Sequence, residues 1–124
     1  MHIHLENNTN HTIQAYTASS VRILSQTYNT HILVGAHFLF PNWQIQHLQK
    51  SPLSLADLEC CFSYQPRLIL LGANNWSKII TSALKTALEE KKIAVEAMPI
   101  GAACRTFNVL LSEHREVVLG IIFN

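Results

Sequence analysis

The chain has 124 residues, of which 48% are hydrophobic and 14% are charged, a balance that favours a well-packed globular domain and excludes disorder. Its length suits one domain over residues 1–124. Nine basic and eight acidic residues give a net charge of +1, too small for the phosphate-binding surface of a nucleic-acid-binding protein.

The sequence also favours the cytoplasm as its location. Its apolar runs are too short to span a membrane, and the start MHIHLENNTNH resembles neither a secretion signal nor a mitochondrial transit peptide. The three cysteines, Cys60, Cys61 and Cys104, are an odd number without metal-type spacing, which is typical of reduced thiols.

The first half of the chain is predicted to form strands. Polar and apolar residues alternate over 12–17 and 20–24, and 31–35 is a short continuous apolar run, typical of a strand covered on both faces. Residues 37–40 and 43–45 are two further short strands on either side of Pro41. The spacing of turn residues indicates an antiparallel meander.

The second half alternates helix and strand. Ser54 and Asp57 form the pattern of a capping box, which begins a short helix that ends before Pro66. A buried strand over 67–72, an amphipathic helix over 77–92 and a strand over 93–98 follow. The predicted elements end with a helix over 101–111 and a strand over 116–123.

This order predicts an α/β fold with three layers. Strands joined by helices through short connections pair in parallel with right-handed crossovers. We therefore expect a three-stranded, largely parallel sheet with helices on one face, and the N-terminal antiparallel strands on the other face.

The stretch GAACRTFNVLLSEHREV (101–117), with PRLILLGA (66–73) and KKIAVEAM (91–98), resembles the family of the mitochondrial NADH dehydrogenase (complex I) assembly factor 3 and its small archaeal and bacterial homologues of unknown function. In that family the last block is similar to Ala-Ala-Cys-Arg-Thr-Tyr-Asn, then apolar residues and Glu-Gly-Arg. Phe107 here replaces the tyrosine, and Glu113-His114-Arg115 replaces Glu-Gly-Arg. The resemblance extends over nearly the whole chain, through the strand pattern and Trp43 in the first half.

The resemblance implies a three-layer β+β/α fold, no established catalytic activity, and protein contacts made in the assembly of a respiratory enzyme. The chain departs from the family pattern at two places. Gly72-Ala73-Asn74 stands where Gly-Thr-Gly is frequent, and Pro99-Ile100 where Asp-Thr is frequent. Both places would face one cleft, so polar groups that could hold a ligand there are missing from this chain.

A polar stripe on the helix over 101–111 is the candidate site. At 3.6 residues per turn, Arg105, Asn108 and Ser112 share one face, opposite Ala103, Phe107, Leu110 and Leu111. Free N–H groups at the helix start and the Arg105 guanidinium could hold a carboxylate or phosphate. The predicted cleft residues are Gly72, Ala73, Gly101, Ala102, Cys104, Arg105 and Asn108. The alternative is structural: Arg105 and Asn108 tie the helix start to the rest of the fold.

Other chemistry has weaker support. Cys104, near a helix start and beside Arg105, could be a nucleophile, but no histidine is placed locally as its base, and a buried thiol is the more frequent role. His2, His4 and His11 have no companion ligands at a metal-type spacing, so no metal or other cofactor is expected.

The sequence therefore predicts a cytoplasmic, non-enzymatic binding or assembly-type protein with one or more protein partners and no nucleic-acid partner. The alternative is a protein or enzyme that binds a small anion in the cleft at the start of the helix. Exposed strand edges would also allow a homodimer.

Overall fold

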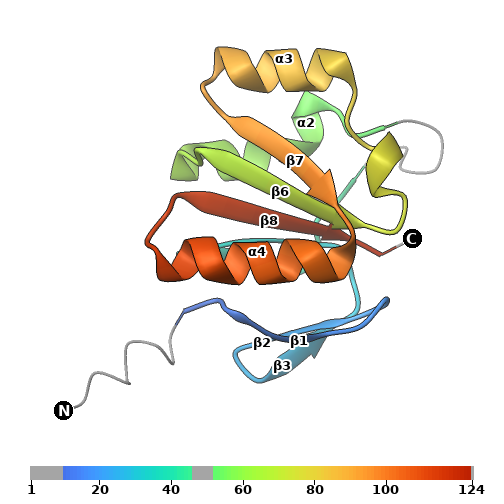
Figure 1. The fold of residues 1–124 in the computed structure, drawn as a ribbon, viewed down its shortest axis with the longest axis vertical. Helices are drawn as coiled ribbons and strands as arrows, with labels where there is room; N and C mark the ends of the chain where they lie inside the picture. Colours follow the sequence, from blue (N-terminus) through green and yellow to red (C-terminus); the bar gives the residue numbers. More distant parts are fainter. Residues whose placement is uncertain (1–9, 46–51, 124) are drawn as a thin grey trace.

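The computed structural model describes residues 10–45 and 52–123 (Figure 1). The helical elements are α2 (Leu55–Leu58), the 3-10 turns η1 (Glu59–Tyr64) and η2 (Trp76–Lys78), α3 (Ser82–Glu90) and α4 (Ile100–Ser112). The strands are β1 (Ile13–Tyr16), β2 (Val21–Ile23), β3 (Gln26–Tyr28), β4 (Ile32–Gly35), β5 (Phe38–Phe40), β6 (Leu68–Ala73), β7 (Ala94–Met98) and β8 (Val117–Ile122).

The strands form two sheets. The larger sheet has the order β5-β4-β8-β6-β7, in which β6 is parallel to both β7 and β8 while β4 is antiparallel to β8 and to β5. The smaller sheet, β1-β2-β3, is an antiparallel meander. In Figure 1 the smaller sheet lies against α4, away from the edge strand β7.

Each face of the larger sheet has its own hydrophobic core. Leu70 and Leu119 point to the face covered by α4 and the smaller sheet, whose Ile13 and Ile23 are buried there. Ile69 and Val118 point to the other face, which α2, η1 and α3 cover. Side chains alternate between the two faces along each strand, and because both faces are covered, every residue of β8 is buried.

The crossovers explain why helices cover both faces. From β6 to β7 the chain moves outward by one strand, and from β7 to β8 it returns across β6. Two right-handed crossovers in opposite directions must place α3 and α4 on opposite faces. As a result, the chain leaves the end of β6 toward α3 on one face of the sheet and the end of β7 toward α4 on the other face. Open α/β sheets often bind ligands at the point between two such strands.

The structure confirms the predicted fold class, a mixed α/β fold with a separate antiparallel sheet, and differs from the expectation in three details. The main sheet has five strands because the hairpin β4–β5 pairs with β8. Helices lie on both faces of it, and α4 shares its face with the smaller sheet. Residues 43–45 are not a strand: the Trp43 ring is buried, and its Nε1 donates to the carbonyl of Asp57 at 2.8 Å.

One strand, β3, was missing from the prediction. The turn between β2 and β3 has two residues, Leu24 and Ser25, and both have positive φ angles, 50° and 66°. A two-residue turn of this kind usually contains Asn-Gly, Asp-Gly or Gly-Gly. The pair Leu24-Ser25 is none of these, so the sequence gives no signal for the turn. β3 itself, Gln26–Tyr28, has no buried residue that would indicate a strand.

Candidate functional site

Of the two predicted cleft residues of β6, Gly72 lies underneath α4, whereas Ala73 belongs to the core on the opposite face of the sheet. Gly72 and Ala73 are buried at the end of the strand. A Cβ on Gly72 would lie 2.9 Å from the Cβ of Ala103 and 3.2 Å from the Cα of Ile100, both in the first turn of α4. Glycine is therefore needed at position 72 so that the helix can approach the sheet, and Ala73 contributes packing to the core on the other face.

Asn108 joins α4 to the smaller sheet. Its side-chain amide makes two hydrogen bonds to one residue of β1: Oδ1 accepts from the N–H of Ile13 at 2.8 Å, and Nδ2 donates to the carbonyl of Ile13 at 3.0 Å. An amide side chain that pairs in this way replaces a neighbouring strand, because it satisfies one donor and one acceptor at the edge of the sheet. Asn108 thus ties α4 to β1.

Arg105 lies one turn earlier and also contacts β1. Its Nη1 donates to the hydroxyl of Tyr16, and the guanidinium carbon lies 6.0 Å from the centre of the Tyr16 ring. The same ring covers Gly101, where a Cβ would come within 2.8 Å of it. Arg105 and Tyr16 are both exposed, so the pair lies at the surface where α4 meets the smaller sheet.

Cys104, the residue before Arg105 in α4, is buried in the core between the helix and the larger sheet. The residue is 1% exposed, and burial raises the pKa of its thiol to about 12, although the nearby charge of Arg105 acts in the opposite direction. A nucleophilic cysteine requires the thiolate form, which a raised pKa makes scarce at neutral pH. Cys61 is buried too, and burial likewise raises its pKa to about 12.

Alkylation should therefore separate the three free cysteines. In the native protein at neutral pH we expect iodoacetamide to modify exposed Cys60 alone, with Cys61 and Cys104 reacting only after denaturation. Peptide mass spectrometry would read the sites. Modification of Cys104 in the native protein at or above its rate in urea would identify an activated thiol and contradict this expectation.

Histidines do not converge on a metal site among the residues that the structure describes. His11 donates from Nδ1 to the carbonyl of Gly35 at 2.6 Å, a contact between the chain before β1 and the end of β4. His2 and His4, the other members of the weakly supported metal hypothesis, lie outside the described residues.

His31 should make stability depend on pH. Its Nδ1 accepts from the N–H of Phe123 at 3.1 Å, and burial lowers its pKa from 6.5. The unfolded chain then takes up a proton at higher pH than the folded one, so stability is complete above pH 6.5 and falls as the pH drops below it. Urea unfolding should show that the free energy of unfolding falls less on acidification in His31→Gln than in wild type. The control His37→Gln, which changes an exposed histidine, should lose as much stability on acidification as wild type does. If His31→Gln also loses as much as wild type, His31 is not the cause of the pH dependence.

Three hollows among the described residues lie at the other end of the parallel strands. A hollow of about 460 Å³ is bordered by His37, Tyr64, His114 and Arg115, and a hollow of about 370 Å³ lies next to it between Arg67 and Arg115. A third, of about 620 Å³, lies between Arg67 and the pair Lys91–Lys92. In the sequence this end is marked by no motif, but charged residues come just before β6, β7 and β8.

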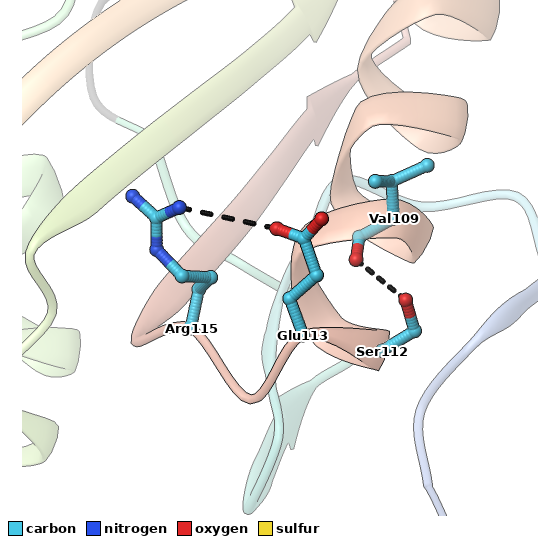
Figure 2. Close-up of polar contacts among 4 residues, drawn as sticks. All are labelled: Val109, Ser112, Glu113 and Arg115. Carbon is cyan, nitrogen blue, oxygen red and sulfur yellow. Dashed lines mark hydrogen bonds and ion pairs between the residues drawn. The ribbon is translucent and has the colours of Figure 1, made fainter.

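The last turn of α4 borders the first two hollows. Ser112 donates to the carbonyl of Val109 at 2.6 Å, and the guanidinium of Arg115 lies 3.9 Å from the carboxylate of Glu113 (Figure 2). Both charged side chains are more than half exposed, at 64% and 55%, so this ion pair contributes little to stability.

The helix ends at this edge have an unusual backbone. Gln65, Lys92 and His114 follow η1, α3 and α4, and all three have positive φ angles, between 54° and 64°. The N–H of Arg115 bonds to the carbonyl of Leu110, as in the helix ends that normally place glycine at this position. His114 therefore occupies a position where a side chain is unfavourable, beside two of the hollows.

Comparison with known proteins relates the whole domain to one family. Residues 13–122 match the model of a family described as protein of unknown function (DUF498/DUF598). No curated protein matches the chain.

Solved structures have the same fold. The XCC1710 protein of Xanthomonas campestris is 27% identical, with 90% of this chain and 83% of that one covered and a TM-score of 0.78. A Bartonella henselae protein described as an outer membrane protein is 25% identical, with 91% and 94% covered and a TM-score of 0.76. A Bordetella pertussis protein described as an Mth938-like domain is 19% identical over 93% and 86%, with a TM-score of 0.72, which shows the fold alone.

Proposed function

Because the chain belongs to the DUF498/DUF598 family of proteins of unknown function, we propose a function from its geometry: it is a non-enzymatic, assembly-type domain that binds another protein. The observation that supports this most directly is the surface made by Tyr16, Arg105 and Val109, here named the α4 face. Tyr16 is 40% exposed and Val109 is 55% exposed, while Arg105 lies between them.

The chemistry of the α4 face suits a protein partner. Arg105 and Val109 are four residues apart on one helix and are therefore neighbours on its surface. Tyrosine and arginine are enriched among the residues that contribute most to protein–protein binding. The contact between Arg105 and Tyr16 and the two bonds of Asn108 to β1 fix helix and sheet in one arrangement, so little side-chain freedom is lost on binding.

The resemblance to the complex I assembly factor 3 family supports a narrower proposal, that the partner is a component of respiratory-complex assembly. All three cysteines are free, which supports a cytoplasmic location. Among the described residues, none of the helices has the length and apolar character needed to cross a membrane.

The test is affinity capture from the native host with a charge placed on the α4 face. Wild type should retain a reproducible partner, and Val109→Glu should lose it, because an unpaired carboxylate would be desolvated in the interface. Thr86→Glu, on the exposed side of α3, is the matched control and should retain the partner. If wild type captures no reproducible partner, or if both variants retain it, the proposal fails for this face.

The second candidate is a small anion held at the start of α4. Gly101 and Ala102 are small and partly exposed, and the N–H groups of the first turn lie beside the exposed Arg105. A thermal unfolding screen against anionic metabolites tests it. A ligand at a hundred times its Kd should add about 2.7 kcal/mol in wild type and nothing in Arg105→Ala.

A homodimer through strand edges also stays a prediction. In the described topology β7 is an edge strand that pairs only with β6, so its outer side could pair with a second copy. Light scattering at micromolar concentration should then give twice the monomer mass, and a monomer throughout would contradict it.

A further inference from the structure

A second surface of the molecule has a different chemistry from the α4 face. The three hollows follow one another along the edge where the parallel strands begin, from the start of β8 past that of β6 to that of β7. They share their borders: Pro66 and Glu116 border the first and third hollows, and Arg115 borders the first and second. The hollows therefore form one row and can be considered as one surface.

Positive charge is concentrated along this row. Four of the nine basic side chains of the chain border the hollows, namely Arg67, Lys91, Lys92 and Arg115, and we name this set the basic edge. Among the residues that the structure describes, Glu116 is the only carboxylate that borders them. Four basic side chains against one acidic side chain give this surface a formal charge of +3, although the whole chain carries +1. Even with Glu113 of the ion pair included, the edge is more positive than the protein.

These charges are largely unused within the domain. All four side chains are exposed. Within residues 10–45 and 52–123, the 3.9 Å contact of Arg115 with Glu113 is the single ion pair, while Lys91 lies over the Phe62 ring at 5.1 Å from its centre. Arg67 and Lys92 have no carboxylate partner in the described part of the chain.

Helix ends explain part of this pattern. Lys91 and Lys92 follow α3, and Arg115 follows α4, where a positive charge interacts favourably with the helix dipole. That role requires neither Arg67, which precedes β6, nor hollows with apolar walls. Phe38 and Leu111 border the first hollow, Leu68 and Leu110 the second, and Phe62 and Ile93 the third. Apolar recesses between cations fit side chains of a bound chain.

We propose that the basic edge binds an extended acidic segment of a partner protein, whose carboxylates pair with Arg67, Arg115 and Lys92 and whose apolar side chains enter the hollows. The row of hollows crosses the starts of the neighbouring strands β8, β6 and β7. An extended peptide can lie along such a row. This inference goes beyond the α4 face and is independent of it, because the two surfaces have no residue in common.

The test is fluorescence anisotropy with a labelled octapeptide of alternating glutamate and leucine as the probe. Saturable binding at low ionic strength, weakened at physiological ionic strength, is expected because screening reduces the attraction between exposed charges. The matched probe, in which lysine replaces glutamate, should not bind. Equal binding of both peptides would overturn the proposal, since it would show a hydrophobic contact without charge selection.

Variants locate the binding. The double substitution Arg67→Gln with Arg115→Gln should raise the Kd of the acidic peptide about tenfold, because two charge pairs are lost. The control Lys78→Gln with Lys85→Gln removes two exposed positive charges outside the hollows and should leave the Kd within about twofold. If both double variants raise the Kd of the acidic peptide equally, the effect of charge is nonspecific and the proposal is overturned.

Two further outcomes decide against it. The absence of a saturable signal in wild type overturns the proposal, whether or not the variants fold. Tighter binding of a labelled oligouridylate than of the peptide would also overturn it and assign the edge to nucleic acid. Val109→Glu should bind the acidic peptide like wild type, which separates a failure here from a failure of the α4 face.

Discussion

Replacing Phe107 by alanine is expected to lower the free energy of unfolding by about 3–5 kcal/mol, the largest single effect that we predict. Phe107 is fully buried in the middle of α4, where it packs between the larger sheet and the smaller one. Removing the ring deletes apolar contacts to both sheets and leaves a cavity that a helix bound on two sides cannot fill by moving. Thermal unfolding should show a midpoint lower by roughly 12–20 °C.

Val109→Ala is the matched control, because it shortens a side chain of the same helix that is 55% exposed. It should change stability by no more than about 0.5 kcal/mol. A loss below about 1 kcal/mol for Phe107→Ala would mean that α4 is not held between the two sheets in the way described.

Replacing Asn108 by alanine should cost about 2–3 kcal/mol, the second largest effect. The substitution removes both hydrogen bonds to Ile13 and leaves that residue's N–H and carbonyl without partners at a site that is 5% exposed. Urea unfolding would measure the loss. Hydrogen exchange at the Ile13 N–H should accelerate more than at the N–H groups of β6, since α4 would no longer protect the outer edge of β1.

Ser112→Ala is the control for this prediction. Ser112 lies one turn beyond Asn108 on the same side of α4, but its hydroxyl bonds only to the carbonyl of Val109 in its own helix (Figure 2). Its loss should cost less than about 0.5 kcal/mol. If Asn108→Ala behaves like Ser112→Ala, the side-chain bonds do not hold β1 in solution.

Local patterns in the sequence were sufficient for most of the elements. The continuous apolar run over 31–35 predicted a strand covered on both faces, and β4 is buried throughout. The spacing of Ala103, Phe107, Leu110 and Leu111 predicted the inner face of α4; three of the four are buried, and Leu110 is half-buried. What local patterns could not supply was the partner of each strand, because β4 and β5 are equally consistent with the meander that precedes them and with the sheet that they join.

The candidate site shows the same limit in its polar residues. The sequence correctly grouped Arg105 and Asn108 as a stripe apart from the core face, since helical periodicity is a local property. Their partners are Tyr16 and Ile13, in a strand near the other end of the chain, and no spacing rule connects them. The hollows at the basic edge are formed by three helix ends that only the folded topology brings together, so they had no signature in any one segment.

The position of β8 has a consequence for synthesis on the ribosome. This strand is the last described element, and yet it lies inside the larger sheet, between β4 and β6. Residues 32–35 have no permanent partner on that side until residues 118–121 have emerged, and β1 likewise waits for Asn108. Nascent chains that lack the final strand would therefore expose two apolar strand edges at once. We expect such chains to be prone to aggregation during translation, because the larger sheet is complete only when β8 has inserted.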